Sequence, residues 1–148
     1  MSSLDSIIKN SLTRASPHTR EVYGQNPLTA SELIELANSR VLTLAATVRP
    51  DSRPHLSPTD FVSVDGIFYL GVDEATARYR NLKQNPAVTV MLADDRKRQA
   101  ILEGNAKFLD MNGSTAHRVL EAQKKKYGWV TDALAEFTLS KAFTWKAK

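Results

Sequence analysis

The sequence contains no cysteine among its 148 residues. Disulfide bonds and thiolate-ligated metal sites are therefore excluded, and nothing indicates an oxidising compartment. No apolar run approaches the roughly 20 residues that a membrane-spanning helix needs. The first ten residues also lack the long apolar region of a secretory signal. We therefore expect a cytoplasmic protein that does not bind membranes.

The sequence also carries only a small net charge. Lys and Arg number 20 and Asp and Glu 16, which leaves a net charge of +4. This excess suits an anionic ligand but is too small to indicate nucleic acid, and the basic residues lack interleaved aromatics. His18 and His117 have no partners at metal-ligand spacing, so we expect no metal site.

The composition is that of an ordinary globular protein, with 42% hydrophobic and 24% charged residues. Residues 1–28 are rich in Ser, Thr, Pro and Asn and form an N-terminal extension with a short helix over residues 4–13. This extension either packs on the core or on a partner subunit, or is partly disordered. Residues 29–148 form the single predicted domain.

Helical and strand patterns alternate irregularly along that domain. Thr29 and Glu32 form a capping box that starts a helix reaching about Asn38. Residues 41–48 are nearly all apolar, which predicts a strand buried on both sides. Residues 55–63 predict a second strand, in which Pro58 requires an edge or a bulge. Asp65-Gly66 predicts a hairpin into a strand over 67–70.

The second half of the domain repeats this mixture. We expect a helix over about 75–84, hairpin strands over 87–93 and 99–109, the longest helix over 113–127 and a last strand over 137–145. Hairpins without regular βαβ alternation favour a mainly β fold, an antiparallel barrel with flanking helices. A barrel of this size leaves its ligands to the rim or to a dimer seam.

The segment Arg78-Tyr79-Arg80-Asn81-Leu82 follows a strand that closes on Gly71 and starts a helix that Asn85-Pro86 stops. Unpaired N–H groups and the helix dipole attract anions to such a terminus. Guanidinium groups grip phosphate with two parallel hydrogen bonds. The segment therefore predicts a site for a phosphorylated cofactor. On a regular helix, Arg78 and Arg80 point about 200° apart, so both can reach one phosphate only if Arg78 still lies in the loop. Asp73 and Glu74, which would weaken phosphate binding, are expected to point away.

An ordered set of short pieces carries a family resemblance over residues 30–146. The pieces are Arg53-Pro54-His55-Leu56-Ser57-Pro58, the Asp65-Gly66 hairpin with Ile67-Phe68-Tyr69-Leu70, Arg80-Asn81-Leu82 with Asn85-Pro86-Ala87-Val88, Glu103-Gly104-Asn105-Ala106 and Lys141-Ala142-Phe143-Thr144-Trp145. Together they resemble the FMN-binding split-barrel proteins related to pyridoxamine 5′-phosphate oxidase. The resemblance implies a six-stranded antiparallel split β-barrel that forms a homodimer, with a flavin between the subunits.

The resemblance also implies which residues bind the cofactor, while no catalytic side chain is assigned. Arg78 matches the basic residue on the phosphate, with Thr76 beside it, so we rank Arg78 first and Arg80 lower. The residues under the flavin ring are Ser57, Thr59, Asp60, Phe61 and Val62, with Leu70 and Gly71 on the neighbouring strand. Gln99 matches a residue that reaches the flavin from the second subunit, and Trp145 is a further candidate. The Arg-x-His substrate motif of true pyridoxamine phosphate oxidases is missing near the C-terminus, so that vitamer is not the expected substrate.

The leading hypothesis is an FMN-dependent oxidoreductase that exchanges a hydride with a small planar or nicotinamide-type substrate. A second hypothesis replaces FMN with the deazaflavin coenzyme F-420, whose acidic tail Lys83, Arg96, Lys97 and Arg98 would accommodate. A third is a non-catalytic flavin- or haem-binding module. Trp129 and Trp145 are expected in the core or a dimer seam, with stacking on a flavin as the lesser alternative, and Lys124–Lys126 at a solvated helix end.

Overall fold

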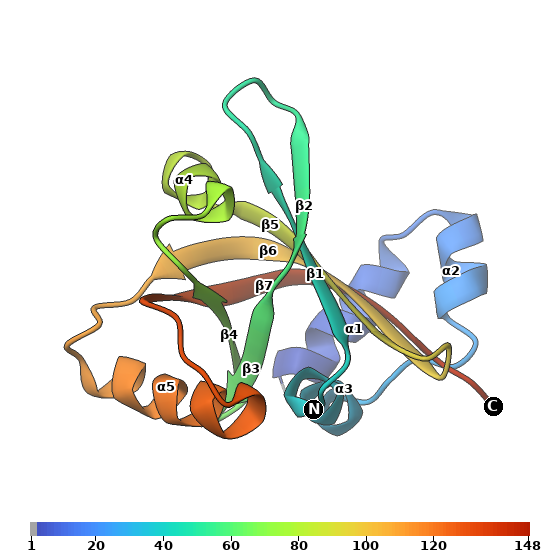
Figure 1. Cartoon of the computed structure of the whole chain (residues 1–148). Coiled ribbons are helices and arrows are strands. Elements are labelled where there is room, and N and C mark those ends of the chain that lie inside the picture. Colours follow the sequence, from blue (N-terminus) through green and yellow to red (C-terminus); the bar gives the residue numbers. More distant parts are fainter. Residues whose placement is uncertain (1–2) are drawn as a thin grey trace.

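The computed structural model describes residues 3–148, in which one curled antiparallel sheet forms a half-barrel (Figure 1). Its seven strands lie in the order β2-β1-β5-β6-β7-β4-β3. This confirms the mainly β, split-barrel prediction, with seven strands in place of six. The strands are β1 (Leu42–Val48), β2 (Pro54–Pro58), β3 (Asp60–Val64), β4 (Ile67–Val72), β5 (Ala87–Asp94), β6 (Arg98–Phe108) and β7 (Ala133–Lys146).

The extra strand arises because the predicted strand over 55–63 is divided at Thr59. β2 pairs with β1, whereas β3 pairs with β4 at the opposite edge of the sheet. Pro58 has no N–H to continue a ladder, and the Thr59 N–H donates to the Thr43 carbonyl instead (3.1 Å). A single stretch of chain therefore joins the two edges of the sheet and curls it into a half-barrel.

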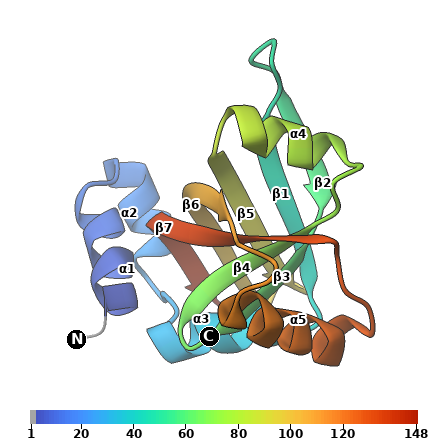
Figure 2. The same cartoon turned by 90° about the vertical axis from the view of Figure 1, so that its left-hand side faces the viewer.

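Helices close the ends of this half-barrel. They are α1 (Ser3–Thr13), α2 (Pro17–Tyr23), α3 (Ala30–Asn38), α4 (Ala77–Gln84) and α5 (Ser114–Tyr127). Figure 2 shows α1 and α2 together on one side of the sheet and α5 on the other. The Thr29 cap is confirmed, since its hydroxyl accepts the Glu32 N–H (3.2 Å). Within residues 3–148, no helix is long and apolar enough to cross a membrane.

The core lies inside the curl of the sheet. Phe61 is completely buried there and stacks on Phe68 at 5.4 Å between ring centroids. Ile8 of α1 and Leu28 belong to the same hydrophobic cluster. The Ser11 hydroxyl also accepts the Ala142 N–H (3.0 Å). Part of residues 3–28 therefore packs directly against β7.

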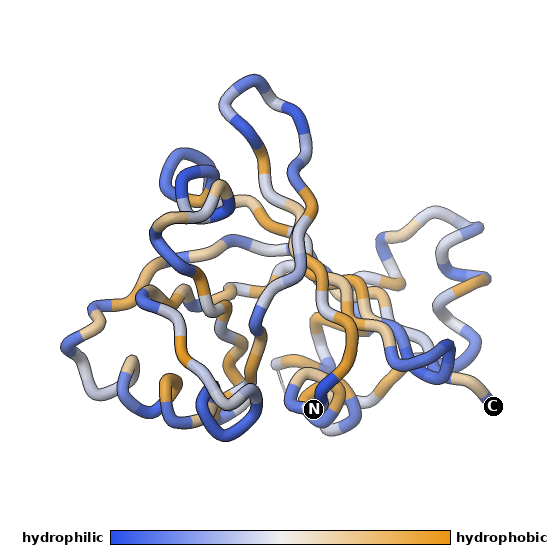
Figure 3. Tube along the Cα trace, viewed as in Figure 1, coloured by the Kyte–Doolittle hydropathy of each residue, from blue (hydrophilic) through white to orange (hydrophobic). Residues whose placement is uncertain are grey.

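The prediction that residues 41–48 are buried on both sides is wrong within the single chain. Burial alternates along β1, with Thr43, Ala45 and Thr47 facing inward. The other side of the sheet, here called the outer face, is partly exposed, and Leu42 at its edge is 61% exposed. Figure 3 shows apolar residues along the strands and hydrophilic ones at the tip of the β1–β2 hairpin.

Candidate functional site

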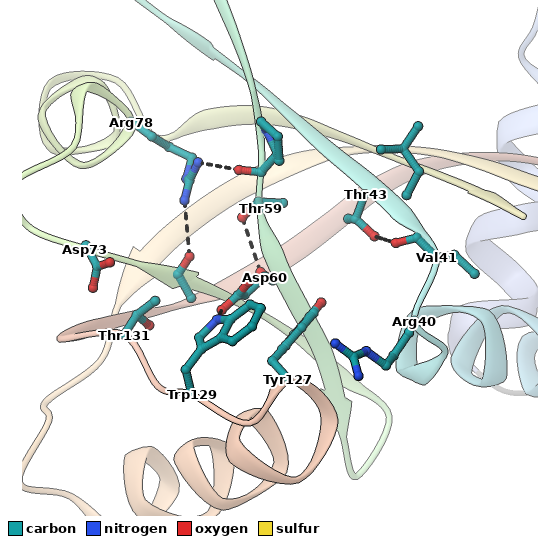
Figure 4. Close-up of a pocket in the computed structure, with 13 residues that line it drawn as sticks. Arg40, Val41, Thr43, Thr59, Asp60, Asp73, Arg78, Tyr127, Trp129 and Thr131 are labelled. Atoms are coloured by element: carbon teal, nitrogen blue, oxygen red, sulfur yellow. Dashed lines mark hydrogen bonds between the residues drawn. The ribbon is translucent and has the colours of Figure 1, made fainter.

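A cleft of about 450 Å³ opens where β2 gives way to β3 (Figure 4). The start of β1, the end of β4, the first turn of α4 and the segment after α5 also contribute to it. Its lining residues are Arg40, Val41, Leu42, Thr43, Pro58, Thr59, Asp60, Gly71, Asp73, Arg78, Tyr127, Trp129 and Thr131. The cleft therefore combines two guanidinium groups, two carboxylates and two large aromatic rings.

Arg78 reaches the inner end of the cleft and is almost completely buried. Its Nη1 donates to the Ser57 hydroxyl (2.8 Å) and to the Pro58 carbonyl (2.9 Å), and its Nη2 lies 3.4 Å from the Gly71 carbonyl. Its Nε has no hydrogen-bond partner. Burial lowers the pKa of the guanidinium, and the Asp60 and Asp73 carboxylates oppose that shift. A buried cation with an unused donor favours binding of an anion.

The local sequence of α4 explains why Arg78 faces inward. The Thr76 hydroxyl accepts the Tyr79 N–H (3.2 Å) and so starts the helix there. Arg78 follows in the first turn, on the same buried side as Asn81. Arg80 is exposed and reaches only the Ala75 carbonyl of its own helix, at 3.5 Å. The two arginines thus point to different sides of α4.

Asp73 does not point away from this site, contrary to expectation. It lines the cleft with Arg78, and Figure 4 shows its carboxylate at the cleft wall. The reason is the connection to β7, since Asp73 Oδ1 accepts the Asp132 N–H (3.0 Å). An anion bound at Arg78 would therefore have a carboxylate nearby.

Gly71 lets the walls of the cleft come together at the end of β4. A Cβ at this position would collide with Gln123 Nε2 and crowd Thr131 Oγ1 and Asp60 Cβ. The Gln123 amide uses that space to donate to Asp60 Oδ2 (2.9 Å) and to Thr131 Oγ1 (3.1 Å). Glycine is required here for close approach rather than for an unusual backbone angle.

The outer edge of β3 is covered by side chains of other elements. The Phe61 N–H donates to the Tyr127 hydroxyl (2.9 Å), and the Phe61 carbonyl accepts from Lys126 Nζ (2.7 Å). Two residues on, Asn38 bonds both backbone groups of Ser63. Backbone groups of an edge strand are binding positions for a ligand. Here a ligand reaches those of Phe61 only if Tyr127 and Lys126 move aside.

Lys126 is half-buried, so the expectation that the whole run Lys124–Lys126 is a solvated helix end is wrong for this residue. Its ammonium group donates to the carbonyls of Ala37 and Phe61, both at 2.7 Å. Burial lowers its pKa to about 8, with Asp60 opposing and Arg40 reinforcing the shift. Burial also raises the pKa of the Tyr127 hydroxyl.

Trp129 lies at the cleft and is 52% exposed, so its predicted place in the core is wrong, while a place in a dimer seam stays a prediction. Its indole N–H donates to Asp60 Oδ2 (2.7 Å). Its ring stacks on Tyr127, with centroids 5.5 Å apart and planes 24° apart. Gly128, at a φ of 84°, ends α5 and turns the chain between the two rings.

The structure brings only part of the predicted cofactor set together. Thr59, Asp60, Gly71 and Arg78 line the cleft, and Ser57 contacts Arg78. Thr76 caps α4, while the side chains of Phe61, Val62 and Leu70 are buried in hydrophobic clusters. Arg80 is exposed, and Gln99 and Trp145 lie opposite each other on β6 and β7, so these three do not line the cleft.

The sequence reasoning missed Arg40, Tyr127, Trp129 and Thr131, which also line the cleft. The only sequence signal for them is local: Tyr127-Gly128-Trp129 reads as a helix end followed by an exposed aromatic residue. Nothing in the spacing relates Arg40 to Asp60, nor Tyr127, Trp129 and Thr131 to that residue more than 60 positions earlier.

Comparison with known families now places the chain. The model of the family described as pyridoxamine 5′-phosphate oxidase matches residues 30–146. The chain therefore belongs to the pyridoxamine 5′-phosphate oxidase family, as its resemblance implied. Among curated proteins, no sequence matches it.

Solved structures support the same fold at low sequence identity. The conserved hypothetical protein Rv2991 from Mycobacterium tuberculosis is 22% identical, with 80% of this chain and 85% of that one covered and a TM-score of 0.67. The haem storage protein HutZ from Vibrio cholerae is 19% identical, with 76% and 92% covered and a TM-score of 0.65. A protein described as an F420 reductase is also 19% identical, with 73% and 93% covered and a TM-score of 0.59.

Proposed function

We propose that this protein is an FMN-dependent oxidoreductase whose cofactor phosphate is held by Arg78. The observation that carries the proposal is the buried Arg78 guanidinium beside the cleft, whose Nε has no partner. A phosphate oxygen supplies the acceptor that this donor lacks, and charge-assisted contacts of this kind are strong. The Ser57 and Pro58 contacts of Nη1 hold the guanidinium in place for it.

The residues present fit the polar part of a flavin better than its ring. Thr59, Asp60 and Gly71 supply polar groups along the cleft, but the Phe61 backbone is bonded to Tyr127 and Lys126. The proposed site therefore keeps Ser57, Thr59, Asp60, Gly71 and Arg78 as its core, while Thr76 acts by capping the helix that carries Arg78. Contacts at Phe61, Val62 and Leu70 would go through their backbone, because their side chains are buried. A bound flavin supplies hydride exchange, and this chain supplies position and charge.

We also propose that two copies of the chain form the working unit by packing their outer faces together. The strand register aligns Leu44, Met91, Ile101 and Phe143 in one apolar row across four strands of that face. Leu56 on the same face is 64% exposed. A row of partly exposed apolar side chains on a sheet is typical of a protein interface. Gln99 and Trp145 lie in the adjacent row, where a partner's cleft could meet them.

A deazaflavin cofactor is the second candidate, because one structural neighbour is described as an F420 reductase. The basic residues suggested for its acidic tail give it little support. Arg98 pairs with Asp94 (2.9 Å) and Glu35 (3.3 Å), and Lys83 lies over the Tyr79 and Phe108 rings. Neither lines the cleft.

Storage of haem or flavin without turnover is the third candidate, since HutZ is described as a haem storage protein. Haem iron needs an axial ligand such as His, Cys, Met or Tyr. Of these, the described cleft wall offers only Tyr127, whose hydroxyl is bonded to Phe61. This favours a flavin.

The test is a set of absorbance titrations of the full chain with FMN, the deazaflavin coenzyme and haem, followed by mixing with reduced nicotinamides. The proposal predicts the tightest binding for FMN and bleaching of its visible band by a reductant. Tighter binding of either other ligand would replace the cofactor, and binding of none would refute the function.

A further inference from the structure

The mouth of the cleft differs in character from its inner end. Arg78, Thr59 and Gly71 make the inner end polar, whereas Leu42 and Trp129 at the mouth are 61% and 52% exposed. Arg40, at the end of the connection from α3 to β1, also lines the cleft, and Figure 4 shows Tyr127 between its guanidinium and Trp129. The mouth therefore presents two exposed apolar side chains and one guanidinium group.

Trp129 is exposed yet held in one orientation. Its indole N–H donates to Asp60 Oδ2, which also accepts from Gln123 Nε2, and its ring rests on Tyr127. Tyr127 is fixed in turn by the backbone of Phe61. An exposed aromatic ring that several contacts immobilise is a ready stacking surface, because little conformational freedom remains to be lost on binding.

Arg40 has no hydrogen bond or ion pair with any residue in the described range 3–148. Its charge is nevertheless felt in the cleft, since it helps to lower the pKa of Lys126. Figure 4 shows its side chain on the same side of the cleft as Tyr127. A guanidinium without a protein partner beside an aromatic wall suits a carboxylate attached to a flat ring.

We propose that the cleft mouth binds a planar, anionic substrate, with its ring packed against Trp129 and Tyr127 and its anionic group on Arg40. This inference rests on the proposed function, in that the inner end at Arg78 is left to the cofactor phosphate. It adds the class of substrate, a flat aromatic acid, and two residues that determine specificity for it.

The test uses three small probes that separate shape from charge. These are 2-naphthoate, which is flat and anionic, 2-naphthamide, which is flat and neutral, and cyclohexanecarboxylate, which is anionic and not flat. Binding is measured by tryptophan fluorescence and by calorimetry on the full chain, with and without FMN. We expect 2-naphthoate to bind at least about tenfold more tightly than either other probe, given the usual strength of stacking and charge-assisted contacts.

Matched variants identify the residues responsible. Trp129→Ala should weaken 2-naphthoate binding about tenfold, whereas Trp129→Phe, which keeps a ring, should weaken it by no more than about threefold. Arg40→Gln should reduce the preference for naphthoate over naphthamide to about one. Arg49→Gln, at an exposed arginine of the β1–β2 hairpin, should leave both affinities unchanged.

Several outcomes would overturn the inference. Equal affinity for acid and amide, or no effect of Arg40→Gln, removes the anion contact. Unchanged binding in Trp129→Ala would show that Trp129 does not contribute to probe binding, and tighter binding would show that it hinders it. Competition between 2-naphthoate and FMN assigns the mouth to the cofactor, and no naphthoate binding at all refutes the site.

Failure of the proposed function can be distinguished from failure of this inference. If the chain binds no FMN but shows the expected probe pattern, the flavin assignment is wrong and the planar-anion site stands. If it binds FMN and no probe, the reverse holds.

Discussion

Arg78 serves the fold and the proposed ligand with different donors of one guanidinium group. Nη1 joins β2 to α4 through Ser57 and Pro58, while Nε has no partner. A buried arginine that only stabilised the fold would be expected to satisfy all of its donors. The unused donor therefore distinguishes a binding residue from a purely structural one.

Replacing Arg78 with Ala should weaken FMN binding about 10- to 100-fold, the usual cost of losing a hydrogen bond to a charged group. Arg80→Ala should change it by less than about twofold, because Arg80 is exposed on the other side of α4. The two affinities are measured by fluorescence titration, with circular dichroism to check that both variants fold. Equal effects would show that the division between the two arginines is wrong.

Lys126 makes a pH-dependent contribution to stability. Its pKa is about 8 in the folded chain, below the ordinary value of 10.5. Between these values the unfolded chain binds more protons, so the contribution of Lys126 to the free energy of unfolding rises with pH there and is constant below about pH 8.

The measurement is urea unfolding of the natural chain and of Lys126→Met from pH 7 to pH 10. The difference in unfolding free energy should shift in favour of the natural chain above about pH 8. Lys125→Met, at an exposed neighbour, should show no such shift. A constant difference for Lys126→Met would contradict the lowered pKa.

At the scale of elements, the end of α5 builds much of the cleft. Lys126 and Tyr127 cover the outer edge of β3, and Trp129 holds Asp60. Gly71 in β4 allows this arrangement, because Gln123 of α5 fills the space above it. The helix, the edge strand and the end of β4 therefore form one packed unit.

Gly71→Ala should destabilise the chain by about 1–3 kcal/mol, as overpacking in a tight site usually does. It should also displace the Gln123 amide from Asp60. Gly66→Asn is the control, since Gly66 has a positive φ that Asn tolerates and no neighbour within 4 Å of an added Cβ. Thermal unfolding of both variants checks this. An undisturbed melting temperature in Gly71→Ala would show that the space at Gly71 is not limiting.

Much of the element pattern was predictable from the sequence, because its signals are local. The capping box at Thr29 and the hairpin at Asp65-Gly66 each depend on neighbouring residues, and both are present. The division of the predicted strand 55–63 at Thr59 was only partly predictable from the sequence. Pro58 signalled an interruption, but the change of partner from β1 to β4 depends on closure of the whole sheet.

The candidate site was less predictable for the same reason. Arg78 could be singled out because a strand end, a helix start and a family pattern coincide there. Tyr127 and Trp129 reach Asp60 and Phe61 only through tertiary packing of α5 on β3, which leaves no periodic trace in the sequence. Asp73 was misjudged because its partner, the Asp132 backbone, lies far along the chain.

At the scale of the whole molecule, the outer face is where a second copy is expected to pack. Its apolar row contains Met91 near the middle of the sheet. A carboxylate there would be buried without a partner in a dimer, and that cost is high.

Met91→Glu should therefore yield a monomer, while Ile67→Glu, at a 43% exposed residue of the β3–β4 hairpin, should leave the natural chain's mass unchanged. Light scattering after size-exclusion chromatography gives the masses. A monomeric natural chain, or a Met91→Glu dimer, would contradict the proposed interface.

The central claim is that the inner end of the cleft recognises the phosphate of a flavin through Arg78. Parallel titrations with FMN and riboflavin, which differ only by that phosphate, test it most directly. The account predicts at least about tenfold tighter binding of FMN, and loss of this preference in Arg78→Ala. Equal affinities for FMN and riboflavin in the natural chain would contradict it.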